Sequence, residues 1–155
     1  AERMMPGVKT TNYVLGRIGL ERARKSGAHE ALYRDSQGRV REGVTSNIMA
    51  VVDGTVLTPD ENCLAGVTLR SVEAAALRHG LGWSRTEVDV ETLQKADEVW
   101  LSSTIREILP VVGVDGMAVA GGQVGPLFRA IYERFSDNCR AISAEDERES
   151  LLSLR

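Results

Sequence analysis

Short apolar segments separated by tight-turn sequences are the feature that most constrains how this chain folds. Asp53-Gly54 and Asp115-Gly116 each lie between two such segments, and Asp-Gly pairs in this position are typical of two-residue β-hairpins. A third turn, Asp35-Ser36-Gln37-Gly38, ends in a glycine that tolerates a positive φ. Hairpin turns join antiparallel strands, whereas parallel strands need long crossover connections. The sequence therefore predicts hairpins and argues against an array of strand-helix-strand units.

The expected strands and helices form clusters along the chain. Strands are expected over residues 28–35, 39–44, 47–52, 55–58, 83–88, 98–102, 108–114 and 117–120, and the first four predict a meander. Helices are expected over residues 11–26, 67–80, 90–96 and 127–135. Strand clusters interrupted by single helices indicate an α+β domain built in layers.

Two of these helices carry apolar side chains at helical spacing, which predicts that one face of each is buried. The side chains expected in the core are Val14, Leu15, Ile18 and Ala23 in the first helix and Leu127, Phe128, Ile131, Tyr132 and Phe135 in the last. Gly16 and Gly19 lower the helix propensity of the first helix. They indicate either close packing against another backbone or simply a poor helix.

The length and composition match one globular domain and argue against several classes of function. A chain of 155 residues can bury a sizeable core, and a net charge of −3 without a basic stripe argues against nucleic acid as a partner. Cys63 and Cys139 lack the spacing of a disulfide framework or a metal site. No apolar run reaches membrane-spanning length, and the first residues lack the features of a signal peptide. We therefore expect a cytoplasmic protein without a metal or a membrane partner.

Lys9 is the first candidate for a chemical role. It follows a short apolar run and precedes Thr10, Thr11 and Asn12, whose side-chain oxygens suit the first turn of a helix. We expect Lys9 to leave the end of a buried strand beside the positive pole of that helix. Burial and the helix dipole both favour the neutral amine, which is the form that attacks carbonyl carbons. The alternative is an ordinary solvated lysine, as most lysines are.

Glu42 is the second candidate. It lies at a strand end and precedes Gly43 and the cluster Thr45-Ser46-Asn47. A carboxylate in this position suits the protonated ring nitrogen of a cofactor. The alternative is a turn between strands with a glutamate on the surface, because clusters of glycine, serine and asparagine usually indicate turns.

Two segments suit the binding of phosphate. Leu64-Ala65-Gly66-Val67-Thr68 leads into a helix, whose first N–H groups bind anions, unless Thr68 merely caps that helix. Leu101-Ser102-Ser103-Thr104-Ile105 ends a strand in three hydroxyls. Either Ser103 or Thr104 would bind phosphate there, and the alternative is a polar strand exit.

In this order and at this spacing, these segments resemble the larger domain of fold-type IV pyridoxal-phosphate enzymes. That group contains D-amino-acid transaminases, branched-chain aminotransferases and aminodeoxychorismate lyases. The supporting stretches are residues 8–13, 42–47, 66–68, 96–104, 108–111 and 114–116. The family usually has an arginine directly after the segment Gly66-Val67-Thr68, whereas this sequence has Leu69 and then Arg70.

The resemblance implies a mixed or antiparallel sheet arranged as a pseudo-barrel with flanking helices, and pyridoxal 5′-phosphate as the cofactor. Lys9 would form a Schiff base with the cofactor aldehyde and move a proton between the α-carbon of the substrate and the C4′ carbon. Glu42 would keep the pyridine nitrogen protonated. The implied cofactor-binding residues are Lys9, Glu42, Leu64, Gly66, Val67, Thr68, Ser103 and Thr104.

The resemblance also implies an aminotransferase acting between an amino acid, with D-amino acids among the candidates, and a 2-oxo acid. The alternatives are a lyase of the aminodeoxychorismate type, a branched-chain aminotransferase and a half-domain without catalysis. Residues 1–140 would form the larger domain and residues 141–155 a charged tail. The family's smaller amino-terminal domain precedes the lysine and does not occur in this sequence. We therefore expect a homodimer or association with such a missing half.

Overall fold

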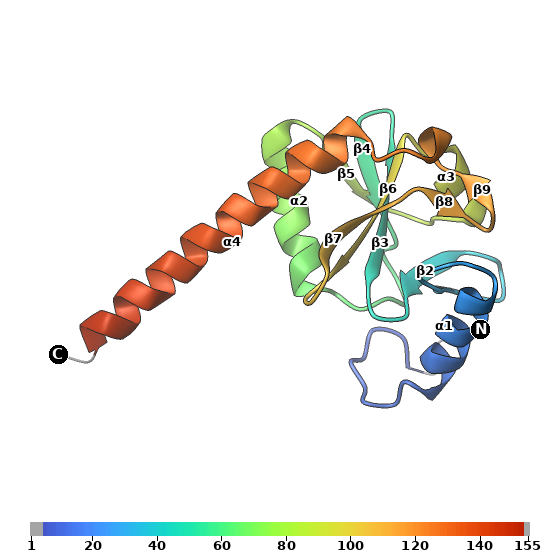
Figure 1. Cartoon of the computed structure of the whole chain (residues 1–155), viewed down its shortest axis with the longest axis horizontal. Helices are drawn as coiled ribbons and strands as arrows, with labels where there is room; N and C mark the ends of the chain where they lie inside the picture. Colours follow the sequence, from blue (N-terminus) through green and yellow to red (C-terminus); the bar gives the residue numbers. More distant parts are fainter. Residues whose placement is uncertain (1–4, 154–155) are drawn as a thin grey trace.

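A five-stranded mixed sheet forms the centre of the structure, a computed structural model that describes residues 5–153 and the side chains of residues 5–141 (Figure 1). Its strand order is β5-β4-β3-β6-β7. The strands are β3 (Asn47–Val52), β4 (Thr55–Thr58), β5 (Gly82–Arg85), β6 (Glu98–Ser103) and β7 (Glu107–Val111). The pair β4 and β5 is parallel and the other pairs are antiparallel. The predicted α+β fold with a mixed sheet is confirmed.

In the described part of the chain, two small antiparallel sheets and four α-helices surround this sheet. The small sheets pair β1 (Leu32–Arg34) with β2 (Val40–Gly43) and β8 (Gly113–Val114) with β9 (Met117–Ala118). The helices are α1 (Val14–Lys25), α2 (Val67–His79), α3 (Val90–Lys95) and α4 (Pro126–Ser153), with a short 3₁₀ turn at Ala120–Gly122. Within the described residues, no helix is both long and apolar enough to cross a membrane.

The predicted hairpin turns are confirmed. Asp53 and Gly54 join β3 to β4 with φ values of 47° and 72°, and Asp115 and Gly116 join β8 to β9 with φ values of 49° and 79°. Both central residues of a type I′ turn need a positive φ, which explains why the Asp-Gly pairs occur there.

The first four strands do not form the predicted continuous meander. The strands β1 and β2 make a sheet of their own, while β3 and β4 belong to the central sheet. A tight turn separates them, in which the Gly43 N–H donates to the Ser46 carbonyl oxygen at 2.7 Å. The expected strand over residues 108–114 is similarly divided, into β7 and β8.

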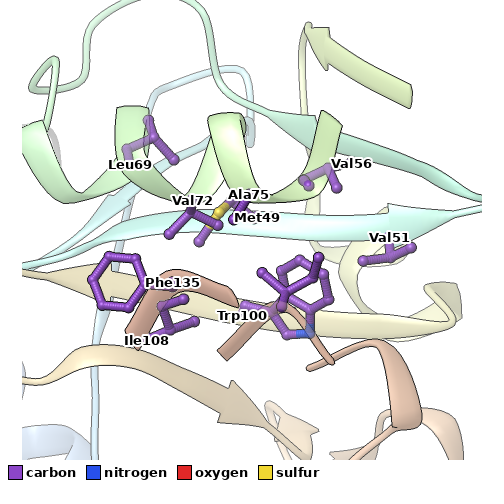
Figure 2. Packing of buried hydrophobic residues seen from close by; sticks show 11 residues of the cluster. Met49, Val51, Val56, Leu69, Val72, Ala75, Trp100, Ile108 and Phe135 are labelled. Carbon is purple, nitrogen blue, oxygen red and sulfur yellow. The ribbon is translucent and has the colours of Figure 1, made fainter. Parts of the chain in front are cut away.

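Side chains of the central sheet alternate between two hydrophobic clusters, one on each face. Met49 and Val51 belong to the cluster beneath α2 and α4, which Figure 2 shows. Ile48 and Ala50 belong to the opposite cluster, which includes Leu93 of α3. The sheet is therefore covered on both faces, and only its ends are available for a polar site.

The last helix, α4, is largely as predicted. Ile131 and Phe135 are buried against the central sheet, which confirms the helical spacing of its apolar residues. Tyr132 differs, because it is exposed and its hydroxyl donates to the Glu107 carboxylate at 2.7 Å. The helix extends away from the body of the molecule (Figure 1) and continues without a break through residue 140, where the expected tail begins.

The expected core face of α1 is wrong. Val14, Leu15 and Ile18 are 64%, 47% and 47% exposed. The buried residue of this helix is Gly16, which packs against Val44 and Tyr33. The spacing of apolar residues correctly indicates that α1 has an apolar face. That face is exposed because no described element packs against it.

The two glycines of α1 are expected to respond oppositely to alanine. A Cβ on Gly16 would lie 2.5 Å from Val44 Cγ1, whereas one on Gly19 would lie 3.6 Å from the Ala31 Cβ. Gly16→Ala should lower the free energy of unfolding by roughly 1–3 kcal/mol through overpacking. Gly19→Ala should raise it by up to about 1 kcal/mol through helix propensity. Chemical unfolding of both variants tests this contrast, and equal effects would contradict close packing at Gly16.

Candidate functional site

A pocket of about 320 Å³ lies at one end of the central sheet, within the roughly 300–1,000 Å³ typical of small-molecule sites. It lies where β3 begins and β6 ends, since Asn47 and Ser102 are paired across these strands and both line it. The lining residues are Lys9, Tyr13, Glu42, Val44, Thr45, Ser46, Asn47, Leu64, Ala65, Gly66, Val67, Thr68, Ser102, Ser103 and Thr104. All of the cofactor-binding residues predicted from the sequence are among them, and their roles stay predictions.

Lys9 lies on the rim of this pocket, exposed and outside any regular secondary structure. The expected buried strand before it is wrong. Residues 5–7 instead form a bend and a turn, in which Gly7 has a φ of 78° and the Val8 N–H donates to the Met5 carbonyl oxygen. The turn tendency of Pro6-Gly7 outweighs the apolar character of the segment. Lys9 therefore lies beside the pocket after a turn, and not at the end of a buried strand.

Glu42 is a buried carboxylate in the wall of the pocket. It is 3% exposed, and its Oε2 accepts a hydrogen bond of 2.9 Å from the Leu64 N–H. A surface glutamate, the alternative considered from the sequence, is therefore wrong. Buried carboxylates require hydrogen-bond donors or cations, so Glu42 suits a partner that carries an N–H group.

The chain from Leu64 to Gly66 is held close to the start of β3. The Leu64 carbonyl oxygen accepts from Asn47 Nδ2 at 2.7 Å, so Asn47 and Glu42 fix both polar backbone groups of this residue. A Cβ on Gly66 would lie 2.1 Å from Asn47 Oδ1. Glycine is required here because the backbone approaches the asparagine side chain this closely.

Charged groups behind the pocket anchor the same loop. The Arg41 guanidinium donates to the Glu61 carbonyl oxygen at 3.2 Å and to the Asp35 carboxylate at 2.7 Å. Burial opposes ionisation of Asp35, but hydrogen bonds from Arg39 and Arg41 outweigh it and hold the pKa of this carboxyl well below its usual range. Burial, and then the charge of Glu42, raise the pKa of the Cys63 thiol. Asp35 is thus a charged anchor, and Cys63 is a neutral neighbour of the site.

The amino terminus of α2 follows this loop and also lines the pocket. Gly66 is its N-cap residue, and no side chain makes a cap hydrogen bond there. The alternative role of Thr68 as a helix cap is therefore wrong. The first N–H groups of a helix have no partner within the helix and carry a partial positive charge. Val67 and Thr68 place these donors at the pocket, where they suit an anion.

The three hydroxyls at the end of β6 differ in their surroundings. Ser102 is 1% exposed, and among the described residues its Oγ has no hydrogen-bond partner. Ser103 Oγ accepts a hydrogen bond of 3.2 Å from the Arg106 N–H. Thr104 is exposed at the pocket.

The rim opposite α2 is held by an ion pair that the sequence analysis missed. The Arg106 guanidinium pairs with the Glu30 carboxylate and donates to Thr45 Oγ1 at 3.3 Å. The Ser46 hydroxyl donates to Glu30 at 3.4 Å. These contacts join segments far apart in the sequence, so no local pattern indicated them. Tyr13, Asn47 and Ser102 also line the pocket; they lie in segments that the sequence analysis singled out but were not among the predicted cofactor-binding residues.

Metal binding has no candidate in the described part of the chain, where no group of three His, Cys, Asp or Glu side chains is placed to hold an ion.

The sequence matches known proteins over most of its length. Residues 1–114 match the family model described as "Amino-transferase class IV". A branched-chain-amino-acid aminotransferase of Pseudomonas aeruginosa is 30% identical over 126 residues, which are 81% of this chain and 41% of that protein. A D-alanine aminotransferase of Staphylococcus haemolyticus is 34% identical over 131 residues, which are 83% of this chain and 46% of that protein. The chain thus spans less than half the length of these curated relatives.

A solved structure is similar in fold as well. The branched-chain amino acid aminotransferase of Thermobaculum terrenum, solved in its holo-form with pyridoxal phosphate, has a TM-score of 0.81 and 28% identity. The match covers 86% of this chain and 45% of that one. The similarity in fold, like the similarity in sequence, therefore extends over more than four-fifths of this chain.

Proposed function

This chain belongs to the class IV aminotransferase family, and from that membership we propose that it is the cofactor-binding part of a pyridoxal-phosphate-dependent aminotransferase. The protein would transfer an amino group between an amino acid and a 2-oxo acid. One observation carries the proposal, namely that Lys9, Glu42 and the uncapped amino terminus of α2 line one pocket. The amine of Lys9 would react with the cofactor aldehyde, and the Glu42 carboxylate would pair with the ring nitrogen. The N–H groups at the start of α2 would donate hydrogen bonds to the phosphate.

The residues of the pocket fit this cofactor. A phosphate needs several hydrogen-bond donors. The pocket offers the first N–H groups of α2 together with the hydroxyl of Ser102, which has no partner among the described residues. The close approach of Gly66 to Asn47 keeps the backbone at the pocket wall. Glu42 is buried in the same wall through its bond to Leu64, where it suits a protonated ring nitrogen.

Each side chain then has a distinct task. When bound, pyridoxal phosphate supplies an electron sink for negative charge at the α-carbon of the substrate. Lys9 would hold the cofactor through its amine and, once free, would take and return the proton of the α-carbon. Glu42 would keep a proton on the ring nitrogen by its negative charge. Val67, Thr68, Ser103 and Thr104 would hold the phosphate, and Leu64 would pack against the ring.

The proposal includes the class of amino donor and the oligomeric state of the whole protein. The relatives include aminotransferases named for branched-chain amino acids and for D-alanine, so donors of both kinds are the candidates. The exposed apolar side chains of α1 and of Met5 and Val8 support contact with further protein beside Lys9. We propose a homodimer for the whole protein, and sedimentation velocity measures it.

A donor panel tests the proposed reaction. The whole protein with added pyridoxal phosphate is mixed with 2-oxoglutarate and either L-leucine or D-alanine, and formation of glutamate is measured. We expect turnover with one donor and at least about tenfold preference over the other, because L- and D-amino acids present the α-hydrogen differently to Lys9 and these two donors also differ in side chain. Formation of a product from added aminodeoxychorismate, without formation of glutamate, would instead favour a lyase. Absence of both products, with the cofactor bound, would leave a binding half-domain.

A further inference from the structure

Ser102 is the hydroxyl of the segment Leu101-Ser102-Ser103-Thr104-Ile105 to which the sequence analysis assigned no role. Its side chain is 1% exposed, and its Oγ has no hydrogen-bond partner among the described residues. A buried hydroxyl without a partner costs free energy, and such groups are uncommon in folded proteins. Ser102 also lines the pocket, so a bound ligand is able to provide the missing partner.

Ser102 lies near the amino terminus of α2. It pairs with Asn47 across β3 and β6, and it is two residues from Trp100, so the two side chains share one face of the sheet. Trp100 belongs to the cluster beneath α2 and α4. Ser102 therefore lies on the side of the sheet that α2 covers, and it lines the same pocket as Val67 and Thr68 at the start of that helix.

The neighbouring hydroxyls are differently placed. Ser103 Oγ already accepts from the Arg106 backbone, and Thr104 is exposed to solvent. Ser102 alone among these three is buried without a partner in the described chain.

The charges of the pocket increase the need for such a donor. Lys9 is the one cationic side chain among the described lining residues, and in the proposed function its amine is used by the cofactor aldehyde. The remaining donors for a phosphate among the described lining residues are neutral, namely backbone N–H groups and hydroxyls. Hydrogen bonds from neutral donors to an anion are about twice as strong as those between neutral groups.

We infer that the Ser102 hydroxyl donates a hydrogen bond to the cofactor phosphate from the floor of the pocket, together with the first N–H groups of α2. This inference rests on the proposed function for the identity of the ligand. It makes Ser102 a determinant of selectivity for the phosphorylated cofactor over its dephosphorylated form.

Ser102→Ala in the whole protein tests the inference. The cofactor-free protein is titrated with pyridoxal phosphate and separately with pyridoxal, which has the same aldehyde and ring without the phosphate. We expect the Kd of pyridoxal phosphate to rise about tenfold, the size of one charge-assisted hydrogen bond, and the Kd of pyridoxal to stay within about twofold. The thermal midpoint of the cofactor-free variant should not fall, because no protein hydrogen bond is removed. Ser84→Ala on β5, outside the pocket, is the matched control and should leave both Kd values unchanged.

Other results overturn the inference. Equal weakening for both compounds, with a lower thermal midpoint, would make Ser102 a structural residue only. An unchanged Kd for pyridoxal phosphate would show that the hydroxyl does not contact the phosphate.

Borohydride reduction of the wild-type protein distinguishes failure of the proposed function from failure of this inference. If Lys9 carries no cofactor but inorganic phosphate binds in a Ser102-dependent way, the anion site stands and the proposed function fails. If the wild-type protein binds neither compound nor phosphate, both are refuted.

Discussion

Replacing Lys9 with alanine is expected to reduce amino transfer by a factor on the order of 10³ or more, because both the covalent hold on the cofactor and the proton-transfer group are lost. Lys9 is exposed on the pocket rim, so the free energy of unfolding should change by less than about 0.5 kcal/mol. The cofactor would still bind through its phosphate and ring. Steady-state turnover and chemical unfolding of the variant measure both quantities.

Borohydride reduction followed by peptide mass analysis identifies the attachment site directly. The wild-type protein should carry the reduced cofactor on Lys9, and Lys9→Ala should carry none. Lys25→Ala, at the end of α1 and outside the pocket, is the control and should behave as the wild type does. Added ethylamine should restore part of the turnover of Lys9→Ala by supplying a free amine. Retention of the attached cofactor in Lys9→Ala would refute the assignment.

Changing Glu42 to glutamine should slow turnover by about 10²–10⁴-fold, the range of a lost charge or proton-transfer contribution, while cofactor remains bound. The amide oxygen of glutamine still accepts the hydrogen bond from the Leu64 N–H that Glu42 accepts at 2.9 Å, so the wall of the pocket should persist. The negative charge that favours a protonated ring nitrogen is removed. Withdrawal of electrons from the α-carbon then becomes weaker.

The kinetic isotope effect distinguishes this cause from a general disturbance. With substrate deuterated at the α-carbon, the effect on kcat should increase in Glu42→Gln, since breaking of that bond limits the rate more strongly. Glu61→Gln changes an exposed glutamate of the adjacent loop and should leave turnover and the isotope effect unchanged. Turnover of Glu42→Gln at the wild-type rate would exclude Glu42 as the partner of the ring nitrogen.

The two glycines of α1 differ in a way that the sequence does not indicate. Both lie in the same helix and have the same intrinsic cost in it. Gly16 meets Val44 at a distance that admits no side chain, whereas Gly19 has ordinary space. The difference arises from Val44, which follows β2, and from Tyr33 of β1. Only the tertiary structure could therefore distinguish close packing from a poor helix at these glycines.

Short sequence patterns correctly indicated the turns and helix ends that depend on a few adjacent residues. The Asp-Gly turns, the end of α2 at Gly80 with its φ of 92° and the short helix α3, capped by Asp89, follow from conformational preferences of a few adjacent residues. The resemblance to fold-type IV enzymes correctly indicated the family. It also named residues from distant segments that the structure gathers into one pocket.

By itself, then, the sequence determined the Asp-Gly turns, the positions of α2 and α3 and the family, and it named residues that the structure brings into one pocket with Lys9. These depend on neighbours along the chain or on an ordered set of motifs. The tertiary structure decided that Lys9 follows a turn and not a buried strand, that α1 leaves Val14, Leu15 and Ile18 exposed, and that Glu42 is buried against Leu64. It also decided that Ser102, and not Ser103 or Thr104, is the buried hydroxyl without a partner among the described residues. Burial and hydrogen-bond satisfaction depend on which distant surfaces meet, and no periodicity within one segment contains that information.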